Sequence, residues 1–299
     1  MRLLATLLVM LPCVAFAYPI PPQNVWNLVK MSELIVDATV EDVKVVSPEH
    51  DKSFTVAVLR VEETWKGEAM KSVEVVLEPN MMCLVTARYE KGERVVAFLG
   101  GDKQGQWHTV AFSYGVRRPA GAVERDDMKR AIREAETLQR EGGESADQRW
   151  ALNAYASPSL RWDALLQLQP PETGQGRSPE FRDSETPYAS EVLEELERLF
   201  IARPSFDENV MHTLRLLSDR PSKALDAVVA EVIETVLMYE VSPSWVEGSI
   251  WLLARRHRVV LPFGAVESRA SDADQRMWRR FKKRVGLKPK LRIDYSRPR

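Results

Sequence analysis

The chain has 299 residues, of which 44% are hydrophobic and 28% charged, and its formal net charge is -1. This composition is that of an ordinary globular protein, and the length suffices for two domains of moderate size. With two cysteines in the whole chain, Cys13 and Cys83, a framework of several disulfides is excluded.

The first 17 residues, MRLLATLLVMLPCVAFA, have the pattern of a secretory signal peptide. Arg2 precedes a short apolar stretch, and Ala15-Phe16-Ala17 provides small residues at the two positions that signal peptidase reads. The stretch is shorter than the roughly 20 apolar residues of a transmembrane helix. We therefore expect cleavage between Ala17 and Tyr18, and an exported product that is periplasmic or extracellular and has no transmembrane segment.

Cys13 offers a second interpretation of this leader, as the anchor of a lipoprotein. Pro12 stands directly before Cys13, where a lipoprotein signal has a small residue, so the cleaved form is favoured. Cleavage leaves Cys83 as the one cysteine of the mature chain, which then folds without an intramolecular disulfide.

Residues 34–112 contain short Val-rich stretches in which hydrophobic and polar side chains alternate, as in β-strands. The alternation slips at Glu41-Asp42 and then resumes, which predicts a β-bulge. The segment SFTVAVLRV (53–61) is apolar on both faces and is expected to lie centrally in the sheet. Further strands are expected at 73–77, 82–87, 94–99 and 107–112, and their close spacing with Gly turns predicts a small barrel or sandwich.

The order of these segments resembles that of bacterial relatives of the netrin-like domain, the OB-fold module also used by tissue inhibitors of metalloproteinases. The matching segments, within residues 26–118, are LVKMSELIVDATVEDV, TVAVLRVEETWKGE, VEVVL, the lone Cys83 and YEKGERVVAFL. The resemblance implies an OB-like β-barrel, which we place at residues 18–119. Metalloproteinase inhibition is not implied, because the animal inhibitors chelate the protease zinc through an N-terminal cysteine and this mature chain would begin at Tyr18.

OB-folds often bind oligonucleotides or oligosaccharides, but the fold by itself does not establish a function. The aromatic residues of this region, Trp65, Trp107, Phe112 and Tyr114, are too scattered in the sequence to predict a stacking platform. We expect no specific nucleic-acid site.

After residue 119 the periodicity becomes helical, and Pro-Ser recurs before leucine-rich segments at 158, 204 and 243. This spacing is close to the period of HEAT and armadillo repeats, about 40–47 residues. Together with the amphipathic segments 126–140, 188–200 and 222–239, it predicts about three antiparallel helix pairs, HEAT-like, over residues 120–168 and 188–285. An irregular bundle with chance recurrence of Pro-Ser is the alternative. The predicted fold class is α+β, with an N-terminal β-barrel and a C-terminal helical array.

Two of these helices begin with the S-x-x-E pattern of a capping box, Ser205 with Glu208 and Ser244 with Glu247. Residues 169–187, QPPETGQGRSPEFRDSETP, are rich in Pro, Gly and charge, which predicts a flexible insertion in the array.

The C-terminal residues 276–299 contain eleven Lys or Arg and one acidic residue, so the rest of the chain carries an excess of negative charge. Met277, Trp278, Phe281 and Val285 share one helical face, which predicts a cap on the helical array or a basic amphipathic helix on an anionic surface. The two are not exclusive if residues 290–295 and their basic neighbours remain exposed. Residues 286–299 are expected to form a basic tail. The candidate contacts with an anionic surface are Arg276, Arg279, Arg280, Lys282, Lys283, Arg284, Lys288 and Lys290.

The sequence contains no G-x-S-x-G, H-E-x-x-H or C-x-x-C motif and no phosphate-binding glycine loop. The four histidines, His50, His108, His212 and His257, share no metal-ligand spacing. No catalytic, cofactor-binding or metal-binding residue and no cofactor is therefore predicted.

These features favour an exported, non-enzymatic binding or scaffold protein of the bacterial cell envelope, with a protein or an anionic envelope surface as its partner. One alternative is a hydrolase whose site is built from residues scattered in the sequence. Another is a protease-inhibitor-like module that lacks the N-terminal cysteine.

Cys83 lies in an apolar segment, so its thiol is expected to pack in a core; an intermolecular disulfide, or chemistry with His108, is the alternative. The native protein should then resist an aqueous maleimide and react only after unfolding. Cys83→Ala should lower the free energy of unfolding by about 1 kcal/mol, because it leaves a small cavity. Labelling of the native protein within minutes would contradict core packing.

Overall fold

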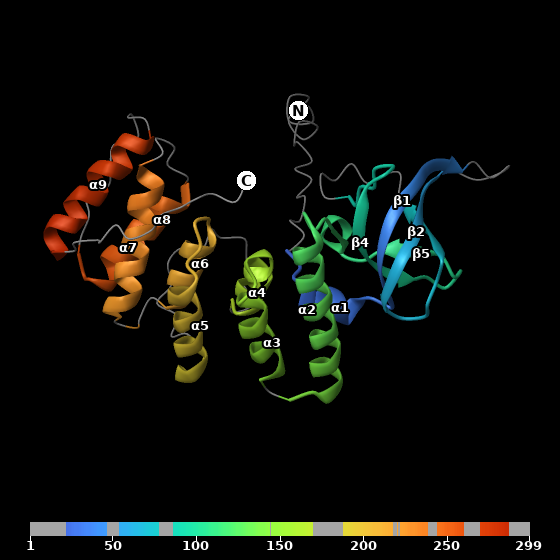
Figure 1. Cartoon of the computed structure of the whole chain (residues 1–299), viewed down its shortest axis with the longest axis horizontal. Helices are drawn as coiled ribbons and strands as arrows, with labels where there is room; N and C mark the ends of the chain where they lie inside the picture. The colour runs from blue at the N-terminus through green and yellow to red at the C-terminus, as the bar shows by residue number, and fades with distance from the viewer. Residues whose placement is uncertain are drawn as a thin grey trace, which may run out of the picture.

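A computed structural model describes residues 22–46, 54–77, 86–143, 145–169, 188–217, 220, 222–238, 244–259 and 270–286. Cys13, Cys83, the leader, residues 170–187 of the expected insertion and the chain beyond 286 lie outside these residues. The chain forms a β-barrel at one end and an array of helices that extends away from it (Figure 1).

Five strands close the barrel in the order β1-β2-β3-β5-β4, and β4 pairs with β1 to complete the circle. All pairings are antiparallel except that of β3 with β5, which is parallel. A closed five-stranded barrel of this kind is consistent with an OB-fold. The strands are β1 (Leu34–Val46), β2 (Phe54–Lys66), β3 (Ser72–Leu77), β4 (Arg94–Gly101), β5 (Trp107–Thr109) and the short β6 (Val116–Arg117), which pairs with β4.

Because its side chains alternate as predicted, β1 contributes to two hydrophobic clusters, one inside the barrel and one between the barrel and the helices. Leu34, Val36 and Ala38 fill the barrel interior, whereas Ile35 packs outward against the helices. The predicted bulge is confirmed, because the pairing with β2 shifts between Val40 and Asp42. The central position of β2 is also confirmed, since it pairs with β1 on one side and β3 on the other.

Two expected strands differ in the structure. Residues 82–85 lie outside the described part of the chain, and Thr86 and Ala87 belong to no strand. The strand expected at 107–112 ends at Thr109, because Ala111 and Phe112 adopt left-handed backbone conformations, with φ of 51° and 55°. A 3-10 turn, η1 (Phe112–Gly115), follows and leads into β6.

Nine helices are found among the described residues, including two that the sequence did not predict, α1 and α3. They are α1 (Val25–Met31), α2 (Ala122–Glu141), α3 (Ala146–Tyr155), α4 (Arg161–Gln167), α5 (Ser190–Ala202), α6 (Asn209–Leu216), α7 (Lys223–Leu237), α8 (Ser244–Arg256) and α9 (Ala270–Val285), with a 3-10 turn η2 (Pro158–Leu160) before α4.

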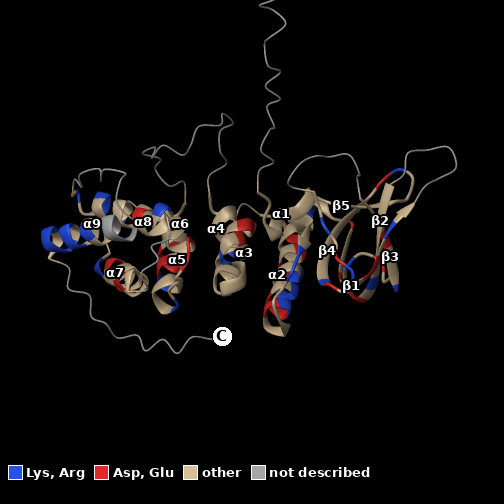
Figure 2. Cartoon of the chain, turned by 90° about the horizontal axis from the view of Figure 1, so that it is seen from above, with Lys and Arg blue, Asp and Glu red and all other residues tan. Residues whose placement is uncertain are grey.

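The helices form two rows, which Figure 2 shows from above. Helices α2, α3, α5 and α7 pack successively in one row, and α1, α4, α6 and α8 pack successively in the other. Helix α9 packs on α8 at the far end. Because α1 precedes the barrel and α2 follows it, the barrel is inserted between two helices that pack against each other.

The two predicted capping boxes do not form as expected. Ser205 is buried and donates a hydrogen bond to Asp207 Oδ1 at 2.5 Å, and the same oxygen accepts the backbone N–H of Asn209 at 2.9 Å. Asp207, rather than Ser205, therefore satisfies the start of α6. Ser244 is the first residue of α8 rather than the residue before it.

Among the described residues, none of the helices combines the length and the apolar character that crossing a bilayer requires.

Gly115 provides a test of the junction between the barrel and η1. A Cβ atom at this position would lie 2.1 Å from the carbonyl oxygen of Val110, a contact with backbone that cannot relax cheaply. Gly115→Ala should lower the free energy of unfolding by about 3 kcal/mol or more in chemical denaturation. The matched control is Gly121→Ala, where no atom lies within 4 Å and the backbone is extended. Equal effects of the two substitutions would show that the chain relaxes around position 115.

Candidate functional site

Six of the eight candidate cationic residues lie on α9, the helix at the end of the array. Figure 2 shows their concentration there in blue. Arg276, Arg279, Arg280, Lys283 and Arg284 are exposed, whereas Lys282 is partly buried. We refer to the five exposed residues as the basic face of α9. Lys288 and Lys290 lie outside the described residues.

The opposite face of α9 packs into the array. Trp278 is 3% exposed and Phe281 is fully buried, and their rings stack at 5.5 Å. Phe281 also contacts edge-on the ring of His257, which directly follows α8. Trp278 Nε1 donates a hydrogen bond to Glu234 Oε1 on α7 at 2.6 Å. The apolar face of α9 is thus occupied by the protein itself and serves as a cap.

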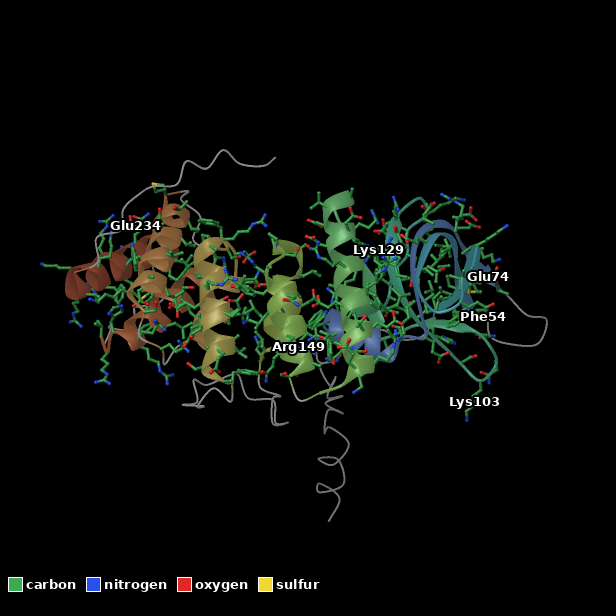
Figure 3. The ribbon with its side chains drawn as sticks, turned by 60° about the horizontal axis from the view of Figure 1, so that its bottom comes forward. Phe54, Glu74, Lys103, Lys129, Arg149 and Glu234 are labelled. Carbon is green, nitrogen blue, oxygen red and sulfur yellow. The ribbon has the colours of Figure 1, made fainter. Side chains whose placement is uncertain are left out.

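The charges of α9 are divided between the array and the solvent. Lys282 pairs with Glu234, which Figure 3 labels on α7, and so joins the cap contacts. Arg279 Nη2 donates to Gln275 Oε1 at 3.2 Å within the helix. Arg279, Arg280 and Lys283 form no ion pair with any carboxylate of the described residues. At 100° per residue, the basic face covers about 140° of the helix circumference.

A buried carboxylate connects the barrel to the helices at the other end of the array. Asp163 Oδ1 on α4 accepts the backbone N–H of Val25 at the start of α1 and an N–H of Arg117 on β6, each at 2.8 Å. Burial raises the pKa of the Asp163 carboxyl, and the Arg117 guanidinium offsets part of this effect. Arg117 also donates to the carbonyl of Gln23. The sequence did not single out Asp163, because its partners are far away in the chain.

Ion pairs also join the outer wall of the barrel to α2. Asp37 is buried on β1 and pairs with Arg94 on β4, at 2.7 Å, and with Arg125 on α2, at 3.0 Å. Glu63 on β2 pairs with Lys129 on α2 at 2.5 Å, and the hydrogen bond from Lys129 lowers the pKa of Glu63. Figure 3 shows Lys129 at the barrel side of the array. The sequence signal that could have revealed the Asp37 contact is the presence of this acidic residue amid the apolar start of β1.

A pocket of about 60 Å³ lies at the seam between β3 and β5. Ligand pockets usually enclose about 300–1,000 Å³, so this one has room for on the order of two water molecules. It is lined by Val76, Leu77, Thr86, Ala87, His108, Thr109 and Phe112.

His108, at the rim of this pocket, contacts a carboxylate with a structural role. Its Nε2 atom lies 3.2 Å from Asp102 Oδ2. Asp102 Oδ1 accepts the backbone N–H groups of Gln104 and Gln106, each at 2.8 Å, and the bond from Gln106 is the main cause of the lowered pKa of Asp102. The carboxylate therefore shapes the turn between β4 and β5.

The other described histidines lie in the helical array, and His50 lies outside the described residues. His257 Nε2 lies 2.9 Å from Asp226 Oδ2 between α7 and α8. His212 on α6 contacts the ring of Trp162 edge-on, and its Nδ1 lies 3.2 Å from Gln169 Nε2. Within the described part of the chain, no three His, Cys, Asp or Glu side chains converge as a metal site would require.

No model of a known protein family and no curated protein matches the sequence.

His212 gives the array a defined pH dependence. Burial lowers the pKa of its imidazole below the ordinary value of 6.5, and the neighbouring Arg215 adds to this effect. Below pH 6.5 the unfolded chain therefore binds a proton that the folded protein does not, so stability falls as the pH falls. In urea denaturation, His212→Gln should lose less stability than the wild type between pH 7.5 and pH 5. Identical pH slopes for the two proteins would contradict a buried neutral imidazole.

Proposed function

We propose that the chain is an exported, non-enzymatic binding or scaffold protein of the bacterial cell envelope that holds an anionic partner at its α9 end. In this proposal, the barrel is a netrin-like OB-fold that lacks the metalloproteinase-inhibiting cysteine, and the two rows of helices are HEAT-like repeats. The strand order of the barrel and the successive packing of alternate helices support these two identifications.

The division of α9 into a buried apolar face and an exposed basic face is the observation that carries the proposal. Trp278 and Phe281 fix the helix in place, so the cations are held in a defined arrangement rather than on a disordered tail. Five exposed cations on one face of a fixed helix form a surface that attracts negative charge.

The continuity of the core supports a scaffold role. One hydrophobic cluster extends from Trp65 and Phe98 of the barrel, through the helices, to Trp278 and Phe281 on α9. A closely packed interior resists deformation, so it holds the two ends of the molecule at a fixed separation. A partner bound at α9 is therefore held at a fixed place relative to the barrel. The small volume of the barrel pocket also favours binding at a surface over catalysis in a cavity.

A fluorescein-labelled polyglutamate peptide can test for an anion-binding end. We expect the wild-type protein to bind it at low ionic strength and to lose affinity as salt is added, because exposed charges are screened. Substitution of Arg279, Arg280 and Lys283 by Gln should weaken binding about tenfold or more. Fluorescence anisotropy measures both effects.

The matched control replaces three exposed arginines of α2, Arg130, Arg133 and Arg140, by Gln and so removes the same charge elsewhere. This control should bind the peptide nearly as the wild type does. Equal losses in the two triple variants would mean that net charge, and not the basic face of α9, determines binding.

A further inference from the structure

The position and the shape of the basic face of α9 favour a planar anionic surface over a folded acidic protein as its partner. Helix α9 lies at one extreme of the molecule and the barrel at the other (Figure 1). The basic face is the outer side of a terminal helix, so it is convex, and its cations extend over about 12 Å of the helix axis. A folded acidic protein would need a concave surface to fit it, whereas a planar layer of charges can approach it directly.

The burial of the aromatic residues determines the mode of contact. A basic amphipathic helix that lies in a membrane interface inserts its apolar face into the lipid. On α9 that face is occupied, because Trp278 and Phe281 pack against α7 and α8. Contact with a surface must therefore use charge alone, within about one Debye length of 8 Å.

We infer that the basic face of α9 docks the protein end-on to a membrane surface rich in anionic phospholipids, without insertion into the hydrocarbon, so that the barrel projects away from the membrane. This inference rests on the proposed anion-binding function and assigns its partner. The cations of α9 meet the phosphates of the lipid headgroups. The helical array separates the barrel from the membrane, and the ion pairs of Asp37 and Asp163 preserve that orientation.

Cosedimentation of the full protein with vesicles tests the partner. The protein should bind vesicles of phosphatidylglycerol and phosphatidylcholine, should not bind pure phosphatidylcholine, and should be released by added salt. Replacing Arg279, Arg280 and Lys283 by Gln should lower the apparent affinity on the order of 100-fold. The α2 triple variant should bind as the wild type does, and circular dichroism should show both variants folded.

The results separate this inference from the proposed function. Binding of polyglutamate without binding of anionic vesicles would overturn the lipid assignment and leave the anion-binding function intact. Absence of binding to both probes would overturn both. Vesicle binding that resists high salt would also contradict the inference, because it would indicate insertion of apolar side chains.

A second measurement tests the orientation. Fluorescent donors can be placed by Lys103→Cys on the barrel and by Met238→Cys at the end of α7, both exposed positions, in a chain without its native cysteines. Figure 3 shows Lys103 and Glu234 of α7 at opposite ends of the molecule. Energy transfer to acceptor-labelled lipids should be strong from position 238 and weak from position 103. Equal or reversed transfer would overturn the end-on orientation.

Discussion

The buried carboxylate of Asp163 is the contact on which the arrangement of barrel and helices depends. It receives hydrogen bonds from the start of α1 and from Arg117 at the end of the barrel, so it holds the chain just before and just after the barrel to α4. Removal of one partner from a buried ion pair leaves an uncompensated charge and costs about 3–5 kcal/mol. Because the barrel is inserted between α1 and α2, α1 lies far from α4 in the sequence. The contact with Asp163 holds these two helices together.

The part of the barrel wall that faces α2 is consequently an interface rather than a solvent face. Ile35, Trp65 and Phe98 join the core of the helices, and Asp37 places its charge between Arg94 and Arg125. Apolar contacts fix the distance between the barrel and α2, and the directional ion pairs fix their register. The two hydrophobic clusters, one inside the barrel and one outside it, therefore hold the barrel and the helices in a fixed relative position.

At the far end the array must be closed, because α7 and α8 would otherwise expose apolar side chains. Trp278 and Phe281 supply this closure, and the helical period then places the cations of α9 in solvent. The same residues that complete the core thus determine where the charges lie. This explains why an amphipathic helix of the kind found in membrane interfaces has no apolar face left to insert.

Local patterns in the sequence determined the bulge at Glu41-Asp42, the alternation of β1 and the two faces of α9, because each depends on neighbours within a few residues. They did not reveal α1, which is seven residues long and has too few turns for a period, or the start of α6, where Asp207 competes with Ser205 for the same backbone groups. The contact between Asp163 and the backbone N–H of Val25 was decided by the tertiary structure alone. The reason is physical: Val25 lies 138 residues away in the chain, and only the packing of α1 on α4 brings its N–H to the carboxylate.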